Sequence, residues 1–208
     1  METVTQNTPV RRRTQAERSA TTRTAVINAA AYCISEKGFA NTTTGHIARR
    51  AGVTWGAIQH QFGDKDAILF ALIERSLDEM AAVVRGAVGD SDDLRERTRH
   101  FVTGMWRVYQ TPAFRAGLEI LLGSRGAKNS DSGLQTRRFI QVLVGLFNET
   151  FSEFDISPER LFEAMRFSLA TLAGFALEET FNGSGGNFDG PLDTLSETLL
   201  TILEAPTA

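Results

Sequence analysis

Side chains that can contact duplex DNA are concentrated between residues 43 and 65 of this 208-residue chain. Three threonines stand where short helices should begin, and a helix start binds phosphate through hydroxyls and unpaired N–H groups. A glycine and an alanine would let a helix approach base pairs closely, and nearby amide, imidazole, indole and ammonium groups can donate to phosphates or base edges. The predicted DNA-binding residues are Thr43, Thr44, Thr54, Trp55, Gly56, Ala57, Gln59, His60 and Lys65.

Two short helices joined by a tight turn should carry these side chains. Ile47 and Ala51 fall on one apolar face of a first helix. Gly52 ends that helix, because glycine takes up the left-handed backbone conformation without strain. Ile58 and Phe62 bury the second helix and leave polar and small residues outward. This pattern predicts a helix-turn-helix, whose second helix enters a DNA major groove.

Two neighbouring assignments stay open at the level of sequence. Trp55 either donates its indole N–H to a phosphate or braces two helices as a hydrophobic side chain. Arg49 and Arg50 either contact phosphates or form a solvated face.

The same stretch resembles a known family. Ala48, Gly52 and Ile58 occupy the small, glycine and apolar positions of helix-turn-helix units. The segments Gly56–Ile58 and Phe62–Leu69 look like the DNA-binding end of TetR-type (tetracycline-repressor-like) transcriptional regulators.

The resemblance covers residues 18–72 and departs at two positions, because the family usually carries tyrosine where this chain has Gln59 and histidine where it has Gln61. It implies a dimeric regulator, more often a repressor than an activator, that binds a palindromic DNA operator. It also implies a small-molecule effector, held in the body of the protein, that releases the operator.

Charge is divided unevenly along the chain, although the net charge is only −3. Through Phe62 there are eight Lys or Arg residues against three acidic ones, a charge of +5, and the remainder carries fourteen against twenty-two, a charge of −8. Such asymmetry is typical of a basic module for a polyanion fused to an acidic body. We expect a basic, disordered arm over residues 1–14, with Arg11, Arg12 and Arg13 following phosphates or remaining a solvated tail.

The rest of the chain shows helical periodicity and no strand pattern, which predicts an all-α fold. We expect an N-terminal three-helix helix-turn-helix head as the DNA-binding domain (residues 15–64) and a C-terminal helical ligand-binding and dimerisation body (residues 65–208). Turn residues predict breaks at 86–93, 123–133 and 183–190. The predicted helices outside the helix-turn-helix are 15–37, 65–88 (with Asp64 at its N-cap), 94–109, one from Pro112, 134–154, 158–181 (with Ser157 at its N-cap) and 191–203.

Aromatic and apolar side chains are frequent in the body and can line an apolar cavity, although most of them should be core. With few charged residues in these segments, we expect the effector of unknown identity to be mostly apolar or aromatic. The candidate ligand-binding residues are Phe101, Met105, Trp106, Tyr109, Phe114, Leu143, Phe147 and Phe167.

The predicted helix from Pro158 is apolar on nearly every side around residues 167–177. A helix that is apolar all round is buried all round, and a second copy of this chain is the expected source of cover. The predicted homodimer interface, a two-fold packing of two helices from each chain, comprises Phe139, Leu146, Leu169, Ala170, Ala173, Gly174 and Leu177.

Other functions find little support in the sequence. The three histidines show no metal-ligand spacing, and no phosphate loop or nucleophile elbow is present, so we expect no metal, no cofactor and no enzymatic activity. Cys33, alone, should be a small core residue. No apolar run is long enough for a membrane span, and the polar start predicts a cytoplasmic protein. Two alternatives remain: an effector-independent regulator of the same fold, and a helical small-molecule-binding protein or enzyme with a vestigial DNA-binding head.

Overall fold

The computed structural model describes residues 14–123, 130–182 and 186–205, and every regular element in these ranges is an α-helix. The predicted all-α fold is therefore confirmed. In chain order the helices are α1 (Gln15–Lys37), α2 (Thr44–Ala51), α3 (Trp55–Phe62), α4 (Lys65–Val88), α5 (Leu94–Tyr109), α6 (Pro112–Gly123), α7 (Ser130–Phe151), α8 (Pro158–Asn182) and α9 (Asp189–Glu204).

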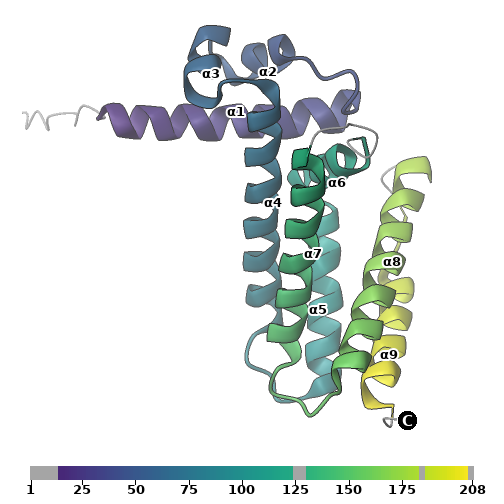
Figure 1. The fold of residues 1–208 in the computed structure, drawn as a ribbon. Coiled ribbons are helices and arrows are strands. Elements are labelled where there is room, and N and C mark those ends of the chain that lie inside the picture. The colour runs from purple at the N-terminus through teal and green to yellow at the C-terminus, as the bar shows by residue number, and fades with distance from the viewer. Residues whose placement is uncertain (1–13, 124–129, 183–185, 206–208) are drawn as a thin grey trace, which may run out of the picture.

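Helices α1, α2 and α3 form the head at one end of the molecule (Figure 1). Helix α1 begins with a capping box, in which the Thr14 hydroxyl accepts from the Glu17 N–H and the Glu17 carboxylate accepts from the Thr14 N–H. Its apolar face is fully buried at Val26, Ala30 and Ile34. The two short helices pack against that face, so α1 forms the floor on which the helix-turn-helix rests.

Helix α4 joins the head to the body. Asp64 caps its first turn by accepting from the Ala67 N–H at 2.8 Å, as the sequence predicted. In Figure 1 the helix starts beside α1 and runs down the length of the body, where it packs against α5. One hydrophobic core runs from Ile58 in the head, through Leu72 in α4, to Leu199 in α9.

Helices α5 to α9 make up the body together with α4. Helix α6 lies directly under the C-terminal half of α1, while α7, α8 and α9 run along the length of the body (Figure 1). The largest fully buried side chains include Phe114, Phe147 and Phe151. Cys33 is buried at 3% exposure, as predicted, and burial raises the pKa of its thiol.

Helix α4 ends at Val88, as predicted, so the predicted break at 86–93 starts later than Gly86. One glycine costs a helix only about 1 kcal/mol, and the flanking Val84 and Val88 are buried. Two other predicted helix boundaries were wrong by a few residues. Helix α7 spans Ser130–Phe151 instead of 134–154, and α9 begins at Asp189, ahead of its proline. The predicted basic arm, apart from Thr14, and the segments 124–129 and 183–185 lie outside the described residues.

Within the described ranges, no helix is both long enough and apolar enough to cross a membrane.

Candidate nucleic-acid interface

The start of α2 is fixed by a reciprocal cap. The Thr43 hydroxyl accepts from the His46 N–H at 3.3 Å, and His46 Nδ1 lies 3.5 Å from the Thr43 nitrogen, which donates to it. The Thr43 hydroxyl keeps its own proton, because a hydroxyl carries one donor as well as two acceptor lone pairs. Thr43 is exposed and Thr44, the first helical residue, is half-buried. The capped end of α2 can therefore still donate to a phosphate.

The turn between α2 and α3 has the geometry that its glycine predicted. Gly52 has φ 67° and ψ 29°, in the left-handed region, and its N–H donates back to the carbonyls of Ala48 and Arg49. Thr54 then caps α3 by accepting from the Ala57 N–H at 3.2 Å. Because each helix starts and stops through its own neighbours, the angle between α2 and α3 is set locally.

The exposed face of α3 carries the side chains predicted to bind DNA. Trp55 is 40% exposed, Gly56, Gln59 and His60 are exposed, and Ala57 is half-buried. The opposite face is held by Ile58, which is fully buried. The structure therefore leaves Trp55 on the outer surface of the head, and its contact with a phosphate stays a prediction.

Two contacts that sequence reasoning missed hold α3 against α1. The Gln61 amide donates from Nε2 to the carbonyl and hydroxyl of Ser19 at 3.2 and 3.1 Å. The Arg23 guanidinium lies over the Phe62 ring, 4.6 Å from its centroid. Gln61 and Ser19 are 42 positions apart in the sequence, so no local pattern of residues predicts their contact. Gln61 therefore ties α3 to α1.

Two of the neighbouring basic side chains make contacts within the protein. Arg50 makes an ion pair with Glu36 at 2.7 Å and lies over the Tyr32 ring, and both Arg49 and Arg50 are exposed. Lys65 donates from Nζ to the Thr42 carbonyl at 2.7 Å and is half-buried. Its predicted phosphate contact remains a prediction, and in the unbound protein the ammonium holds the loop before α2.

The candidate ligand-binding side chains are packed on one another in the body. Phe101 meets Phe147 edge-on at 5.1 Å between ring centroids, and Trp106 lies 4.8 Å from Phe188. A third group joins Tyr109 to Phe114 at 4.7 Å. Seven of the eight candidates are buried: Phe101, Met105, Trp106, Tyr109, Phe114, Leu143 and Phe147.

Phe167 stands apart from the other seven candidates, because it does not share this interior. It is 40% exposed on the outer side of α8, where it lines a surface groove of about 340 Å³ with Phe162, Arg166 and Ala170. The apolar pattern of α8 does not distinguish an inner from an outer face around this position.

Burial raises the pKa of Tyr109 to about 12, and its hydroxyl reaches the Leu169 carbonyl at 3.5 Å. The pKa of Tyr109 in the folded protein lies above the ordinary value of 10. The contribution of its neutral hydroxyl to the free energy of unfolding is therefore complete below pH 10 and is lost as pH rises toward 12. We expect the wild type to lose about 2 kcal/mol of unfolding free energy relative to Tyr109→Phe over that range. Urea unfolding of both proteins at pH 9 and pH 11.5 checks this, and a constant difference between them would contradict it.

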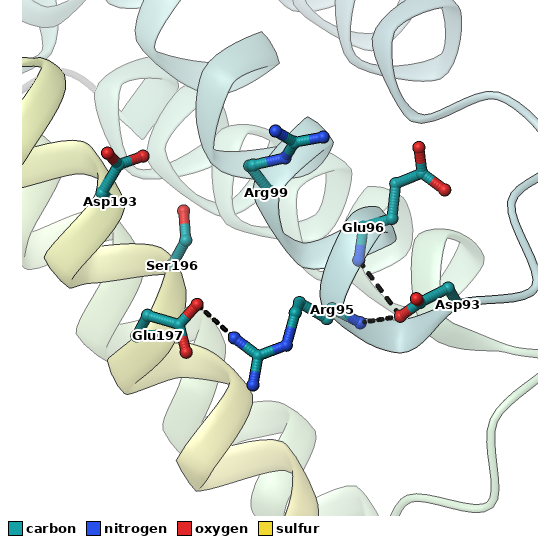
Figure 2. A pocket seen from close by; sticks show the side chains of 7 residues that line it. All are labelled: Asp93, Arg95, Glu96, Arg99, Asp193, Ser196 and Glu197. Carbon is teal, nitrogen blue, oxygen red and sulfur yellow. Dashed lines mark hydrogen bonds and ion pairs between the residues drawn. The ribbon is translucent and has the colours of Figure 1, made fainter.

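A second hollow, of about 570 Å³, lies between the start of α5 and α9 and is lined by charged side chains (Figure 2). Arg95 bridges it in an ion pair with Glu197, and the Asp93 carboxylate accepts from the backbone N–H groups of Arg95 and Glu96. None of the candidate ligand-binding residues lines this hollow. It is therefore distinct from the predicted effector site.

The outer face of α8 carries most of the predicted dimer residues. Ala170, Ala173 and Gly174 are exposed, and Leu177 is 56% exposed. Phe139 and Leu169 are half-buried against the core. Two large apolar side chains that the prediction omitted, Phe162 and Phe181, extend the same face of α8, at 55% and 79% exposure.

Leu146 differs from the other predicted interface residues. It is 3% exposed and packs within the core of its own chain, so it has almost no surface to offer a second subunit. Among the described side chains of α7, the large apolar one that is exposed is Ile140, at 51%.

Among the described residues, no group of three or more His, Cys, Asp or Glu side chains is arranged to hold a metal ion.

Comparison with known proteins places this geometry among bacterial regulators. The family model of bacterial regulatory proteins of the tetR family matches residues 26–72, which run from α1 into α4. The HTH-type transcriptional regulator BetI of Stenotrophomonas maltophilia is 39% identical over 80 residues, a stretch that spans 38% of this chain and only 41% of that relative. The BetI regulator of Burkholderia thailandensis is 29% identical over 196 residues, 89% of this chain and 95% of its own length.

Solved structures share the whole fold. A TetR family transcription regulator from Marinobacter aquaeolei VT8 superposes with a TM-score of 0.68 at 18% identity, covering 91% of this chain and 98% of its own. The TetR family regulator PfmR from Thermus thermophilus gives 0.57 at 20% identity, covering 88% and 99%. The likeness therefore extends beyond the head, through the body.

Proposed function

This chain belongs to the TetR family of DNA-binding transcriptional regulators, and on that premise we propose that it is a homodimeric repressor of a palindromic operator. In this proposal α3 enters the major groove, and a small, mostly apolar effector bound in the body releases the DNA. The protein acts as a regulator in the cytoplasm and not as an enzyme.

One observation carries the DNA-binding proposal. Six of the residues expected to touch DNA are exposed on the two short helices or at their caps, namely Thr43, Thr54, Trp55, Gly56, Gln59 and His60, whereas Ile58 is buried and the Gln61 amide ties α3 to Ser19 of α1. We propose that Trp55, Gln59 and His60 contact phosphates or base edges. The methyl of Ala57 contacts a thymine methyl. The threonines at the N-terminal starts of α2 and α3 bind phosphates.

The apolar outer face of α8 supports the dimer. Leu177 and Phe181 are large apolar side chains that the single chain leaves uncovered, and Ala170 and Ala173 would let a second helix approach closely. A two-fold contact through this face presents two heads, and two heads read half-sites whose centres lie about 34–36 Å apart or a multiple of that distance.

A second candidate, an effector-independent regulator of the same fold, has one observation in its favour. The aromatic side chains proposed to meet the effector lie in contact with one another, as Phe101 and Phe147 do. An effector would then have to separate rings that stabilise each other by about 0.5–1.5 kcal/mol per pair. Screening metabolites for release of the bound operator separates the two candidates.

Fluorescence anisotropy with DNA taken from the promoter region next to its own gene tests the proposed function. We expect tight binding at low salt and an affinity that falls steeply between 50 and 200 mM salt, because each neutralised phosphate releases counterions. A palindromic site should bind one dimer. Binding that does not respond to salt, or no binding at low ionic strength, would refute the proposal.

A further inference from the structure

The head is attached to the body in two ways. Helix α4 is the covalent link, and α6 is the body helix that packs under α1 (Figure 1). A single connecting helix fixes the direction of its axis but leaves rotation of the head about that axis to be set by other contacts. The contact between α1 and α6 supplies the second point of attachment.

A carboxylate makes the polar part of this second attachment. The backbone N–H of Phe39, just after the end of α1, donates to Glu119 Oε2 at 2.9 Å. The two residues are 80 positions apart, and Glu119 is half-buried on α6. A hydrogen bond to a charged acceptor is about twice as strong as one between neutral groups.

The ring of Phe39 makes the steric part. A Cβ atom on Gly123, at the end of α6, would lie 2.6 Å from Phe39 Cδ1, so only glycine leaves room for the ring there. On its other side the ring has the Lys65 ammonium at 5.1 Å from its centroid. The same ammonium donates to the Thr42 carbonyl. The segment between α1 and α2 is thus held by α6 on one side and by α4 on the other.

The segment between α1 and α2 leads directly into the proposed DNA-binding surface. Thr43, which follows Thr42, caps α2 and is a proposed phosphate contact. On the same helix as Glu119, one turn earlier, Arg115 forms an ion pair with Glu179 of α8. Helix α6 therefore contacts α8, which carries the proposed dimer face, and also the segment between α1 and α2, which precedes the helix-turn-helix.

We propose that Glu119 is a positioning residue that fixes the orientation of the head on the body, and thereby the spacing between half-sites that the dimer accepts. The inference rests on the proposed function, since spacing has a meaning only for two heads on one operator. Glu119 itself touches no DNA in this proposal.

The experiment measures spacing selectivity and not affinity alone. The best operator is first selected from random DNA, and versions with one base pair inserted or removed at its centre are then made. One base pair moves a half-site by about 3.4 Å along the axis and rotates it as well. The readout is the ratio of the Kd for the altered spacing to the Kd for the best operator.

In Glu119→Ala we expect this ratio to fall about tenfold, the factor that corresponds to one hydrogen bond to a charged acceptor. Glu119→Gln should keep most of the selectivity, because its amide oxygen can still accept from the Phe39 N–H. Gly123→Ala should lower the ratio independently, since the added methyl displaces the Phe39 ring.

Glu149→Ala is the matched control. Glu149 also pairs across the fold, with Arg85 of α4 at 2.7 and 2.8 Å, but away from the head. It should leave the ratio unchanged. Thermal unfolding confirms that each variant is folded at the temperature of the assay.

The outcomes are distinguishable. Folded Glu119→Ala and Gly123→Ala proteins that keep the wild-type ratio would overturn the positioning role while leaving the regulator intact. A wild type that binds no operator would instead defeat the proposed function, and this inference with it. A ratio that falls equally in Glu149→Ala would assign the effect to general loosening of the body.

Discussion

Replacing Trp55 and His60 together by alanine is expected to lower operator affinity about 100-fold, because each lost base or phosphate contact costs about 1–3 kcal/mol. Both side chains are exposed on α3, whereas Ile58, the residue that anchors the helix, is fully buried. The thermal midpoint should therefore stay close to that of the wild type. Anisotropy titrations with the selected operator measure the loss.

Phe70→Ala provides the control for this double variant. Phe70 is an exposed aromatic side chain like Trp55, at 47% against 40%, but it lies on α4 outside the proposed reading surface. Its removal should leave operator affinity unchanged. Full-strength binding by the Trp55 and His60 double variant would show that α3 contacts DNA through other residues.

The second large effect is expected from Ala173→Glu, which should convert the dimer into folded monomers at micromolar concentration. A two-fold interface contains each substitution twice, so two unpaired carboxylates would be buried close to one another. Each costs several kcal/mol, and the dimer Kd should rise at least about 100-fold. Sedimentation or light scattering after gel filtration measures the mass.

Ala82→Glu is the matched change, because Ala82 is also an exposed alanine within a long helix, on α4. It should remain dimeric. The Ala173→Glu monomer should also lose most of its operator affinity, since one head reads only one half-site. A variant that stays dimeric would place the interface elsewhere than on the outer face of α8.

The sequence by itself determined where the head begins, turns and ends. Thr43, Gly52, Thr54 and Asp64 each act on backbone groups within a few residues, and all four lie where the capping rules put them. Pro112 and Pro158 similarly mark the first residues of α6 and α8. Such contacts are local, so a pattern of residue types is enough to specify them.

Only the tertiary structure decided which apolar side chains face outward. Leu146 and Phe167 both lie on long helices rich in apolar residues, yet the first is buried in its own chain and the second is exposed on α8. Burial depends on which helix packs opposite, and periodicity on a nearly all-apolar helix does not identify that partner.

The contacts between head and body were equally invisible in the sequence. Glu119 meets the Phe39 N–H across 80 residues, and Gln61 meets Ser19 across 42. Lys65 turned out to hold the Thr42 carbonyl in the unbound protein, although its position at the start of α4 suggested a phosphate. The caps of the reading unit follow from neighbouring residues, whereas the orientation of that unit on the body depends on side chains that only folding brings together.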